Sequence, residues 1–274
     1  PPACSLPVGT RYPARIARMA GRLPDVDPDR HYELELIFNF RDLGGIPTAE
    51  GRRVKRDVVF RADGLNRLGG DDLERVAELG LRAVVDLRTV GEQEDHGSFP
   101  VHRHPVAFHH LPLLDELWDL TDPDVHRDPS GYLLDRYVEI AENAGAMFRR
   151  LFELVADDEH VPLVFHCAAG KDRTGVAVAM LLDAVGVDTD RIAHDYGMSA
   201  PASERFMQWA KRTDPQWWAE LQGQPDVFRD APPSVMVAML DQLTARYGSL
   251  EVWRREVGID DDLVAGVRQR LLED

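Results

Sequence analysis

The chain of 274 residues contains only two cysteines, Cys4 and Cys167, which lie far apart in the sequence. A disulfide framework is therefore not expected. The chain also lacks an 18-residue apolar run, and residues 1–21 lack the compact apolar stretch of a secretory signal. We therefore expect no stable membrane insertion, and a location in the cytoplasm or outside the cell without an ordinary signal peptide.

Basic residues are in the minority, with 32 Lys and Arg against 48 Asp and Glu and a net charge of −16. A nucleic-acid or anionic-membrane surface requires broad Lys and Arg neutralisation, which this charge opposes. We therefore expect no nucleic-acid partner, although a local basic pocket is compatible with the composition. The hydrophobic content of 44% is typical of a globular protein with a sizeable core.

The pattern along the chain predicts one domain preceded by an arm. Residues 1–30 are rich in Pro, Arg and Asp without periodicity, which is typical of an arm that lies on the surface or is disordered. From residue 31 to 274 we expect a single catalytic domain. Strand-like stretches occur at 32–40, 57–62, 82–88, 104–113 and 161–167. Helical patterns occur at 69–80, 132–156, 174–186, 203–212, 233–248, 250–258 and 261–273.

This alternation predicts an α/β fold with a mostly parallel central sheet flanked by helices. In the helix at 69–80, we expect Asp71 or Asp72 to cap the N-terminus and Gly80 to end the helix.

The stretch HCAAGKDRTG, residues 166–175, joins the predicted strand at 161–167 to the apolar helix at 174–186. A turn from a strand into a helix points backbone N–H groups at one spot, and the helix dipole adds positive potential there. Cys167 and Arg173 stand at the two ends of this loop, so one phosphate can contact both. Cationic groups and a helix start favour ionisation of a thiol, and we therefore expect Cys167 to be a thiolate nucleophile at neutral pH.

The other loop residues have supporting roles in this interpretation. Gly170 permits an unusual backbone conformation, and Gly175 permits close packing at the helix start. We expect Thr174 to donate its hydroxyl to the cysteine sulfur, and His166 to brace the loop rather than act as a base. Lys171 is either a solvated lysine or a second anion contact. The expected substrate-binding residues are Ala168, Ala169, Gly170, Lys171, Asp172 and Thr174.

Other functions fit the same loop less well. A nucleotide-binding phosphate loop requires G-x-x-x-x-G-K-[ST], but Phe165 lies five positions before Gly170 and Asp172 follows Lys171. A buried structural cysteine would not explain the glycine, arginine and threonine beside it. A rhodanese-like sulfurtransferase and a non-catalytic phosphate-binding module are the alternative functions.

The stretch HCAAGKDRTG matches the H-C-x-x-G-x-x-R-[ST] signature of cysteine-dependent tyrosine and dual-specificity phosphatases. Its G-K-D-R-T-G version resembles the bacterial tyrosine/serine phosphatase type, which includes a secreted mycobacterial enzyme. NFRDLGG at 39–45 and VVDLR at 84–88 resemble upstream motifs of that family, in the same order, and RYGSLEVWRREVG at 246–258 extends the similarity.

The resemblance implies hydrolysis of phosphotyrosine through a phosphocysteine, with phosphoserine, phosphothreonine and phosphoinositides as further substrates. The expected partners are then a phosphorylated protein or a phosphoinositide, with inorganic phosphate as product and competitive ligand. The resemblance also implies that Arg41 or Asp42 braces the catalytic loop. We expect no metal and no organic cofactor.

Breaking the bond to tyrosine requires a proton for the leaving oxygen. Asp86, at the carboxyl end of a predicted strand, is the first candidate and matches the aspartate of the family's D-L-R motif. The alternative is that Asp86 only acts as a cap or forms a salt bridge with Arg88 or Arg41. Asp172 is the second candidate. The third is an acidic segment that contains Asp115, Asp119 and Asp122.

The connection at 111–132 is acidic, contains three prolines and is long for a link between a strand and a helix. It is expected to form either a helical lid over the pocket or a surface excursion. A histidine group nearby does not predict a metal site, because alternation along a strand turns neighbouring side chains to opposite faces. This group consists of His102, His104, His109 and His110.

Overall fold

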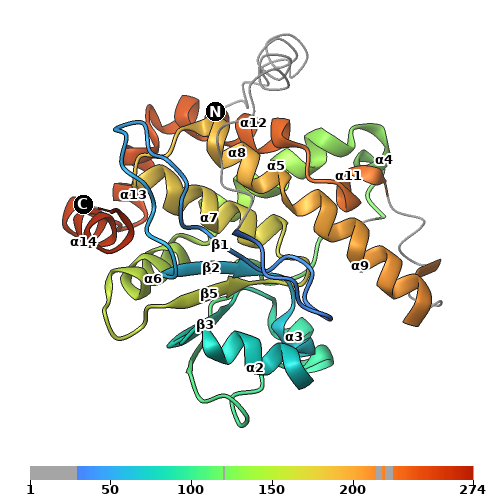
Figure 1. The fold of residues 1–274 in the computed structure, drawn as a ribbon. Coiled ribbons are helices and arrows are strands. Elements are labelled where there is room, and N and C mark those ends of the chain that lie inside the picture. The colour runs from blue at the N-terminus through green and yellow to red at the C-terminus, as the bar shows by residue number, and fades with distance from the viewer. Residues whose placement is uncertain (1–29, 120, 214–217, 220–224, 274) are drawn as a thin grey trace.

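The computed structural model describes residues 30–119, 121–213, 218–219 and 225–273. The predicted arm at 1–30 lies outside the described residues, apart from Arg30. Five short strands form one sheet in the order β1-β2-β5-β3-β4 (Figure 1). They are β1 (Arg41–Asp42), β2 (Val59–Ala62), β3 (Ala83–Asp86), β4 (Ala107–His110) and β5 (Leu163–His166). Only β1 runs antiparallel to its neighbour, so the prediction of a mostly parallel sheet is confirmed.

Helices cover both faces of this sheet. On one face lie α2 (Gly70–Glu78) and α3 (Val90–His96), and α7 (Asp172–Ala184) crosses the other face with further helices behind it (Figure 1). Those further helices include α5 (Pro129–Asn143), α6 (Gly145–Ala156), α8 (Thr189–Gly197) and α12 (Pro233–Tyr247). The other α-helices of the described residues are α4 (Asp124–Arg127), α9 (Ser199–Thr213), α11 (Asp226–Arg229), α13 (Leu250–Glu256) and α14 (Asp261–Leu271). No helix in the described ranges has the length and apolarity needed to cross a bilayer.

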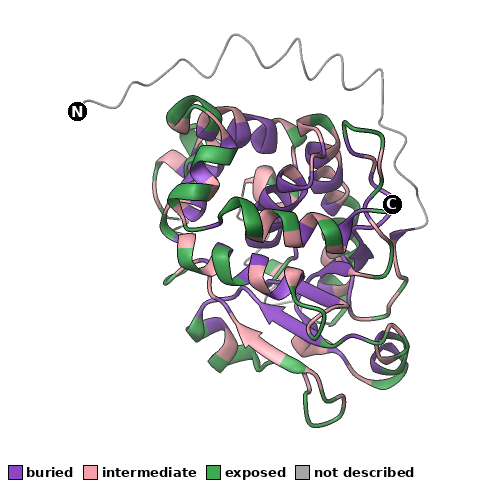
Figure 2. Cartoon of the chain, turned by 90° about the vertical axis from the view of Figure 1, so that its left-hand side faces the viewer, coloured by how far each residue is buried: buried purple, intermediate pink, exposed green. Residues whose placement is uncertain are grey.

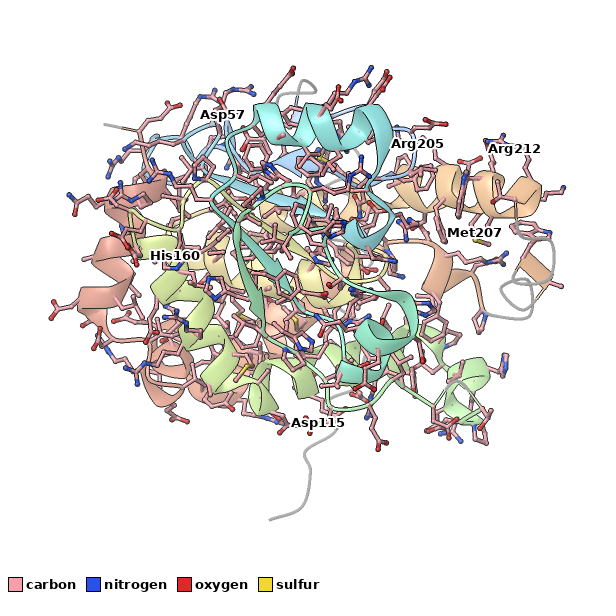
Figure 3. All side chains as sticks on the ribbon, turned by 90° about the horizontal axis from the view of Figure 1, so that it is seen from below. Asp57, Asp115, His160, Arg205, Met207 and Arg212 are labelled. Carbon is pink, nitrogen blue, oxygen red and sulfur yellow. The ribbon has the colours of Figure 1, made fainter. Side chains whose placement is uncertain are left out.

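Alternating strand residues build two hydrophobic cores. Phe60, Val84 and Val164 face a smaller core with α2, and the side chains next to them face a larger core with α5, α6, α7 and α12. This arrangement follows from the period of two along a strand, with apolar residues on both faces. Figure 2 shows the inner strands buried and the outer helices exposed on one side, whereas the edge strand β4 is exposed or half-buried. The apolar pattern of α7 on all sides is thus explained by its place in the larger core.

The strand predicted at 32–40 is wrong, since the regular pairing begins at β1. Two carboxylates accept hydrogen bonds from backbone N–H groups of this segment. In a sheet, these N–H groups would instead bond to a neighbouring strand. Asp72 accepts from the N–H groups of Glu35 and Leu36 at 2.8–2.9 Å, and Asp63 accepts from those of Phe38 and Asn39 at 2.9–3.2 Å. Alternation of apolar residues therefore occurs here without a sheet partner.

The predicted cap of α2 is also wrong. The capping position is Gly69, and Asp71 and Asp72 lie inside the first turn. Gly80, with φ of +65°, follows the end of the helix as predicted. The helix predicted at 132–156 is two helices, α5 and α6, which meet at Ala144.

Candidate active site

The loop 167–171 begins at the carboxyl end of β5 and leads directly into α7. In the sheet register, His166 at the end of β5 lies between Ala62 of β2 and Asp86 of β3. Gly170 has φ of +63°, and a Cβ there would lie 2.4 Å from the carbonyl oxygen of Ala62. The loop therefore packs tightly against the end of β2, in a conformation that only glycine adopts easily. Cys167 is 1% exposed at the base of the loop.

The guanidinium of Arg173 is fixed by the carboxylate of Glu92. NH2 of Arg173 donates to Oε1 of Glu92 at 2.9 Å, and NH1 donates to Oε2. Both side chains are buried. This end-on pairing uses two of the five guanidinium N–H groups and leaves the Nε–H outside the pair. Arg173 is therefore pre-oriented at the start of α7.

Glu92 is held in turn by the N-terminus of α3. Thr89 and Glu92 form a reciprocal capping box, in which the Thr89 N–H donates to Oε2 of Glu92 at 2.9 Å and the Glu92 N–H donates to Oγ1 of Thr89 at 3.2 Å. Burial raises the pKa of the Glu92 carboxyl, but the hydrogen bonds and charge of Arg173 outweigh burial and hold it below its ordinary value. Glu92 is thus an ionised partner for Arg173 at neutral pH.

The middle of the loop is braced from below by Asn39. Nδ2 of Asn39 donates to the carbonyl oxygens of Ala169 and Gly170, each at 3.0 Å. Arg41 donates to Oδ1 of Asn39, so it reaches the loop through this side chain. Asp42 instead accepts from the N–H groups of Gly44 and Asp57 at 2.8 and 3.0 Å. Of the two bracing residues expected from the resemblance, only Arg41 has this connection to the loop.

Asp86 is fully buried and paired with Arg88. Its carboxylate accepts from NH2 of Arg88 at 2.7 Å and from Nε at 3.0 Å, and Nε2 of His166 lies 3.7 Å away. Burial raises the pKa of Asp86, but the bonds from Arg88 prevail and hold it below its usual value. This geometry favours the salt-bridge interpretation of Asp86, because a proton donor must be protonated and reach the substrate.

His166 is also fully buried, and its Nδ1 lies 3.4 Å from the carbonyl oxygen of Cys167. Burial lowers the pKa of His166 to about 4, so the imidazole is neutral at pH 7. This environment favours a bracing role.

Asp172 lies at the first position of α7 and is 21% exposed. Its Oδ1 accepts from the hydroxyl of Tyr137 at 2.5 Å, and Tyr137 also contacts the hydroxyl of Tyr196 at 2.7 Å. The segment 111–132 approaches this group through Trp118, whose ring centroid lies 6.3 Å from that of Tyr137. The predicted lid therefore has a structural link to the loop, and its opening and closing stay a prediction.

Lys171 is bound by the segment 227–230, and its Nζ also lies 3.5 Å from Oδ1 of Asp172. It is 1% exposed, and its ammonium donates to the carbonyl oxygens of Val227, Phe228 and Asp230 at 3.2, 2.8 and 2.9 Å. The three hydrogens of the ammonium are thus matched by three acceptors. In this conformation Lys171 ties α11 to the loop, so neither interpretation from the sequence, a solvated lysine or a second anion contact, describes it.

Two further predictions concern the start of α7. The Thr174 hydroxyl is buried and has no hydrogen-bond acceptor or donor within the described residues, so the expected bond to the Cys167 sulfur is not formed in this conformation. Gly175 does permit close packing, because a Cβ there would lie 2.9 Å from the ring of Tyr196. Within the same residues, no three side chains of His, Cys, Asp or Glu gather as metal ligands.

The sheet, the loop and the buried helix behind it form a phosphatase-type α/β architecture. The model of the tyrosine phosphatase family matches residues 32–273, and the chain belongs to that family. This finding confirms the membership expected from the sequence motifs.

Three relatives illustrate the range of similarity. A putative tyrosine-protein phosphatase of Cupriavidus necator is 34% identical over 181 residues, which cover 64% of this chain and 65% of that protein. A tyrosine-protein phosphatase of Nostoc commune is 26% identical over 234 residues, or 82% of this chain and 78% of that protein. The triple specificity protein phosphatase PtpB of Mycobacterium tuberculosis is 28% identical over 278 aligned positions, covering 88% and 98% of the two chains.

Glu92 and Asn39 were not among the residues predicted from the sequence. A signal for Glu92 was present, because Thr89-x-x-Glu92 directly after a strand is the pattern of a capping box. Asn39 belongs to the NFRDLGG motif, whose resemblance implied bracing roles only for Arg41 and Asp42. The contacts of Glu92 with Arg173 and of Asn39 with Gly170 span 81 and 131 positions, and no local pattern reveals them.

Proposed function

We propose that this protein hydrolyses phosphate monoesters through a phosphocysteine on Cys167, with phosphotyrosine in proteins as its first substrate. The observation that carries this proposal is the pre-oriented Arg173, whose guanidinium is held by Glu92 beside a loop that starts at Cys167. A structural cysteine or a sulfurtransferase would have no need of an arginine fixed in this way. Membership of the tyrosine phosphatase family supports the same reaction.

In the first step, the sulfur of Cys167 attacks phosphorus and an S–P bond forms. The P–O bond to the tyrosine breaks, and the leaving oxygen takes a proton from a carboxyl group. Charge on the three equatorial oxygens is stabilised by the loop N–H groups, the start of α7 and the free edge of Arg173. In the second step a water attacks phosphorus, its proton goes to the same carboxylate, and the thiolate leaves as inorganic phosphate forms.

We propose Asp172 as the carboxyl group of these two steps and Asp86 as a positioning residue. Asp172 directly follows the loop and is 21% exposed, although its Oδ1 accepts from Tyr137 and lies 3.5 Å from Nζ of Lys171, whereas Asp86 is fully buried and paired with Arg88. A group that transfers a proton must reach the substrate oxygen directly or through one water. Asp86 would have to break its bonds with Arg88 to do so.

Activity on phosphoserine, phosphothreonine and phosphoinositides is the broader version of this proposal. It is supported by the name of the mycobacterial relative, a triple specificity protein phosphatase, and by the presence of a lysine within the loop. The observed contacts of Lys171 limit this broader specificity. A second phosphate on the substrate could bind the Lys171 ammonium only after the ammonium leaves the carbonyl oxygens of the segment 227–230. Phosphotyrosine has a single phosphate, so its binding does not require Lys171 to move.

The test is phosphate release from phosphotyrosine, phosphoserine and phosphothreonine peptides and from dispersed phosphoinositides, by wild type and Cys167→Ser. We expect turnover of the phosphotyrosine peptide that Cys167→Ser abolishes, while the variant still binds phosphate. Hydrolysis by Cys167→Ser would disprove the phosphocysteine. Thiocyanate formation from thiosulfate and cyanide would indicate a sulfurtransferase, and phosphate binding by wild type without turnover would indicate a non-catalytic module.

A further inference from the structure

Three arginines converge on one carboxylate beneath the catalytic loop. NH2 of Arg30 and Nε of Arg41 lie 2.9 and 3.2 Å from Oδ1 of Asp195, and NH1 of Arg61 lies 2.6 Å from Oδ2. The three arginines are fully buried and Asp195 is 1% exposed. We call these four residues the arginine cluster. Its one negative charge leaves two of its three positive charges unbalanced.

Such an excess of buried charge is costly, since each ion loses its hydration. Two neighbouring groups among the described residues do not neutralise it. Burial and the charge of Arg41 lower the pKa of His31 to about 4, so this neighbour is uncharged at pH 7. Arg30 contacts Asp42 through the backbone carbonyl oxygen and not the carboxylate. Burial and the charge of Arg61 lower the pKa of Arg41 to about 9, which leaves it protonated at neutral pH.

Arg61 connects this cluster to the catalytic loop. Its NH2 donates to the carbonyl oxygen of Gly170 at 2.6 Å, beside the bond from Asn39 to the same oxygen. In a trans peptide the carbonyl and the following N–H point in opposite directions. A Gly170 carbonyl held toward Arg61 therefore turns the N–H of Lys171 the other way, into the loop. That N–H is one of the groups expected to bind phosphate.

The cluster lies behind the loop as well as bonding to it. The positive charge of Arg61 thus adds to the potential of the α7 N-terminus at the place where the substrate anion would sit. Asp195 opposes this potential, and it also fixes Arg61, since the two are joined at 2.6 Å. The hydroxyl of Ser199, at the start of α9, accepts from Arg41 and Arg61 at 3.3 and 3.4 Å and completes the support.

We propose that Arg61 is a positioning residue that keeps the catalytic loop in its anion-binding form, and that Asp195 limits the positive charge that Arg61 and its neighbours exert on the bound anion. This inference rests on the proposed function, because it assumes that the loop binds phosphate. It predicts opposite effects for the loss of the arginine and the loss of the aspartate. A purely structural role predicts weaker binding in both cases.

The test is the dissociation constant of orthovanadate, measured by calorimetry on the full chain, for wild type, Arg61→Gln, Arg61→Lys and Asp195→Asn. Arg61→Gln should weaken binding about tenfold, the effect of a unit charge across roughly 10 Å at an effective dielectric constant of about 20. Arg61→Lys keeps the charge and should recover part of this loss. Asp195→Asn should bind orthovanadate more tightly than wild type.

Arg254→Gln is the matched control. Arg254 is a mostly buried arginine of α13 that pairs with Asp183, and it should bind orthovanadate as wild type does. Thermal unfolding verifies that each variant is folded. If folded Asp195→Asn binds orthovanadate more weakly than wild type, the charge argument is wrong. If Asp195→Asn does not fold, the decisive comparison is between the two Arg61 variants. The charge argument is then wrong if Arg61→Lys binds orthovanadate no better than Arg61→Gln. Binding does not require turnover, so an enzyme that binds orthovanadate but releases no phosphate would refute the proposed function and leave this inference standing.

Discussion

Replacing Glu92 by glutamine tests whether a buried carboxylate pre-orients the catalytic arginine. Glutamine keeps the size of the side chain and can still accept from the Thr89 N–H, but its amide group would face the donors of Arg173. Removing one partner of a buried ion pair costs about 3–5 kcal/mol of unfolding free energy. We therefore expect Glu92→Gln to be folded but clearly less stable than wild type.

The same change should lower kcat. If a loosened Arg173 loses one of two charge-assisted contacts to the phosphoryl oxygens, the loss is about 1.5–3 kcal/mol, or roughly ten- to a hundredfold in rate. The assay is kcat on a phosphotyrosine peptide, well below the melting temperature of the variant. Glu142→Gln is the control, since Glu142 of α5 pairs with the half-exposed Arg246 away from the loop and should retain wild-type kcat. Wild-type kcat in folded Glu92→Gln would refute the reasoning.

Three further predictions follow from the site. Asp172→Asn should lose about 10²–10⁴-fold in kcat on phosphotyrosine and less on esters with acidic leaving groups, whereas Asp86→Asn should lose equally on both; the reverse pattern would restore Asp86 as the acid. Gly170→Ala should lower the melting temperature and abolish turnover, because its Cβ would lie 2.4 Å from the carbonyl oxygen of Ala62. The depressed pKa of Glu92 contributes stability that is present above the ordinary pKa of a glutamate and is lost as pH falls through the lower folded value, so the melting temperatures of wild type and Glu92→Gln should approach each other as the solution is acidified.

The parts of the site that could be predicted from sequence are those made by neighbours in the chain. Cys167, Gly170 and Arg173 lie within seven positions, and the apolar stretches on both sides identify the strand and the helix that hold them. The parallel sheet follows in the same way from short apolar strands alternating with helices. Local pattern was sufficient to identify these residues, but the side chains that hold the loop, Asn39, Arg61 and Glu92, lie far away in the sequence, and their contacts with it have no local signature.

The strand expected at 32–40 shows where local pattern is insufficient. Its alternation is real, but Asp63 and Asp72 bind its backbone, and neither contact has a sequence signature. The arginine cluster was missed for a related reason. In the sequence, Arg61 lies in an ordinary strand pattern and Asp195 in an ordinary helix pattern. The buried charge becomes visible only in the structure, where these two residues, 134 positions apart, are in contact.

The bonds of Lys171 have a consequence for how this protein can vary. All three acceptors are backbone carbonyl oxygens, and every residue type supplies one. The side chains at positions 227, 228 and 230 are therefore free to change without removing this attachment, as long as the chain follows the same path. Alanine scanning of 227–230 would consequently overlook the attachment, whereas a one-residue deletion there, or Lys171→Met, would expose it. Relatives can thus acquire different side chains in this segment while the loop beneath keeps its anchor.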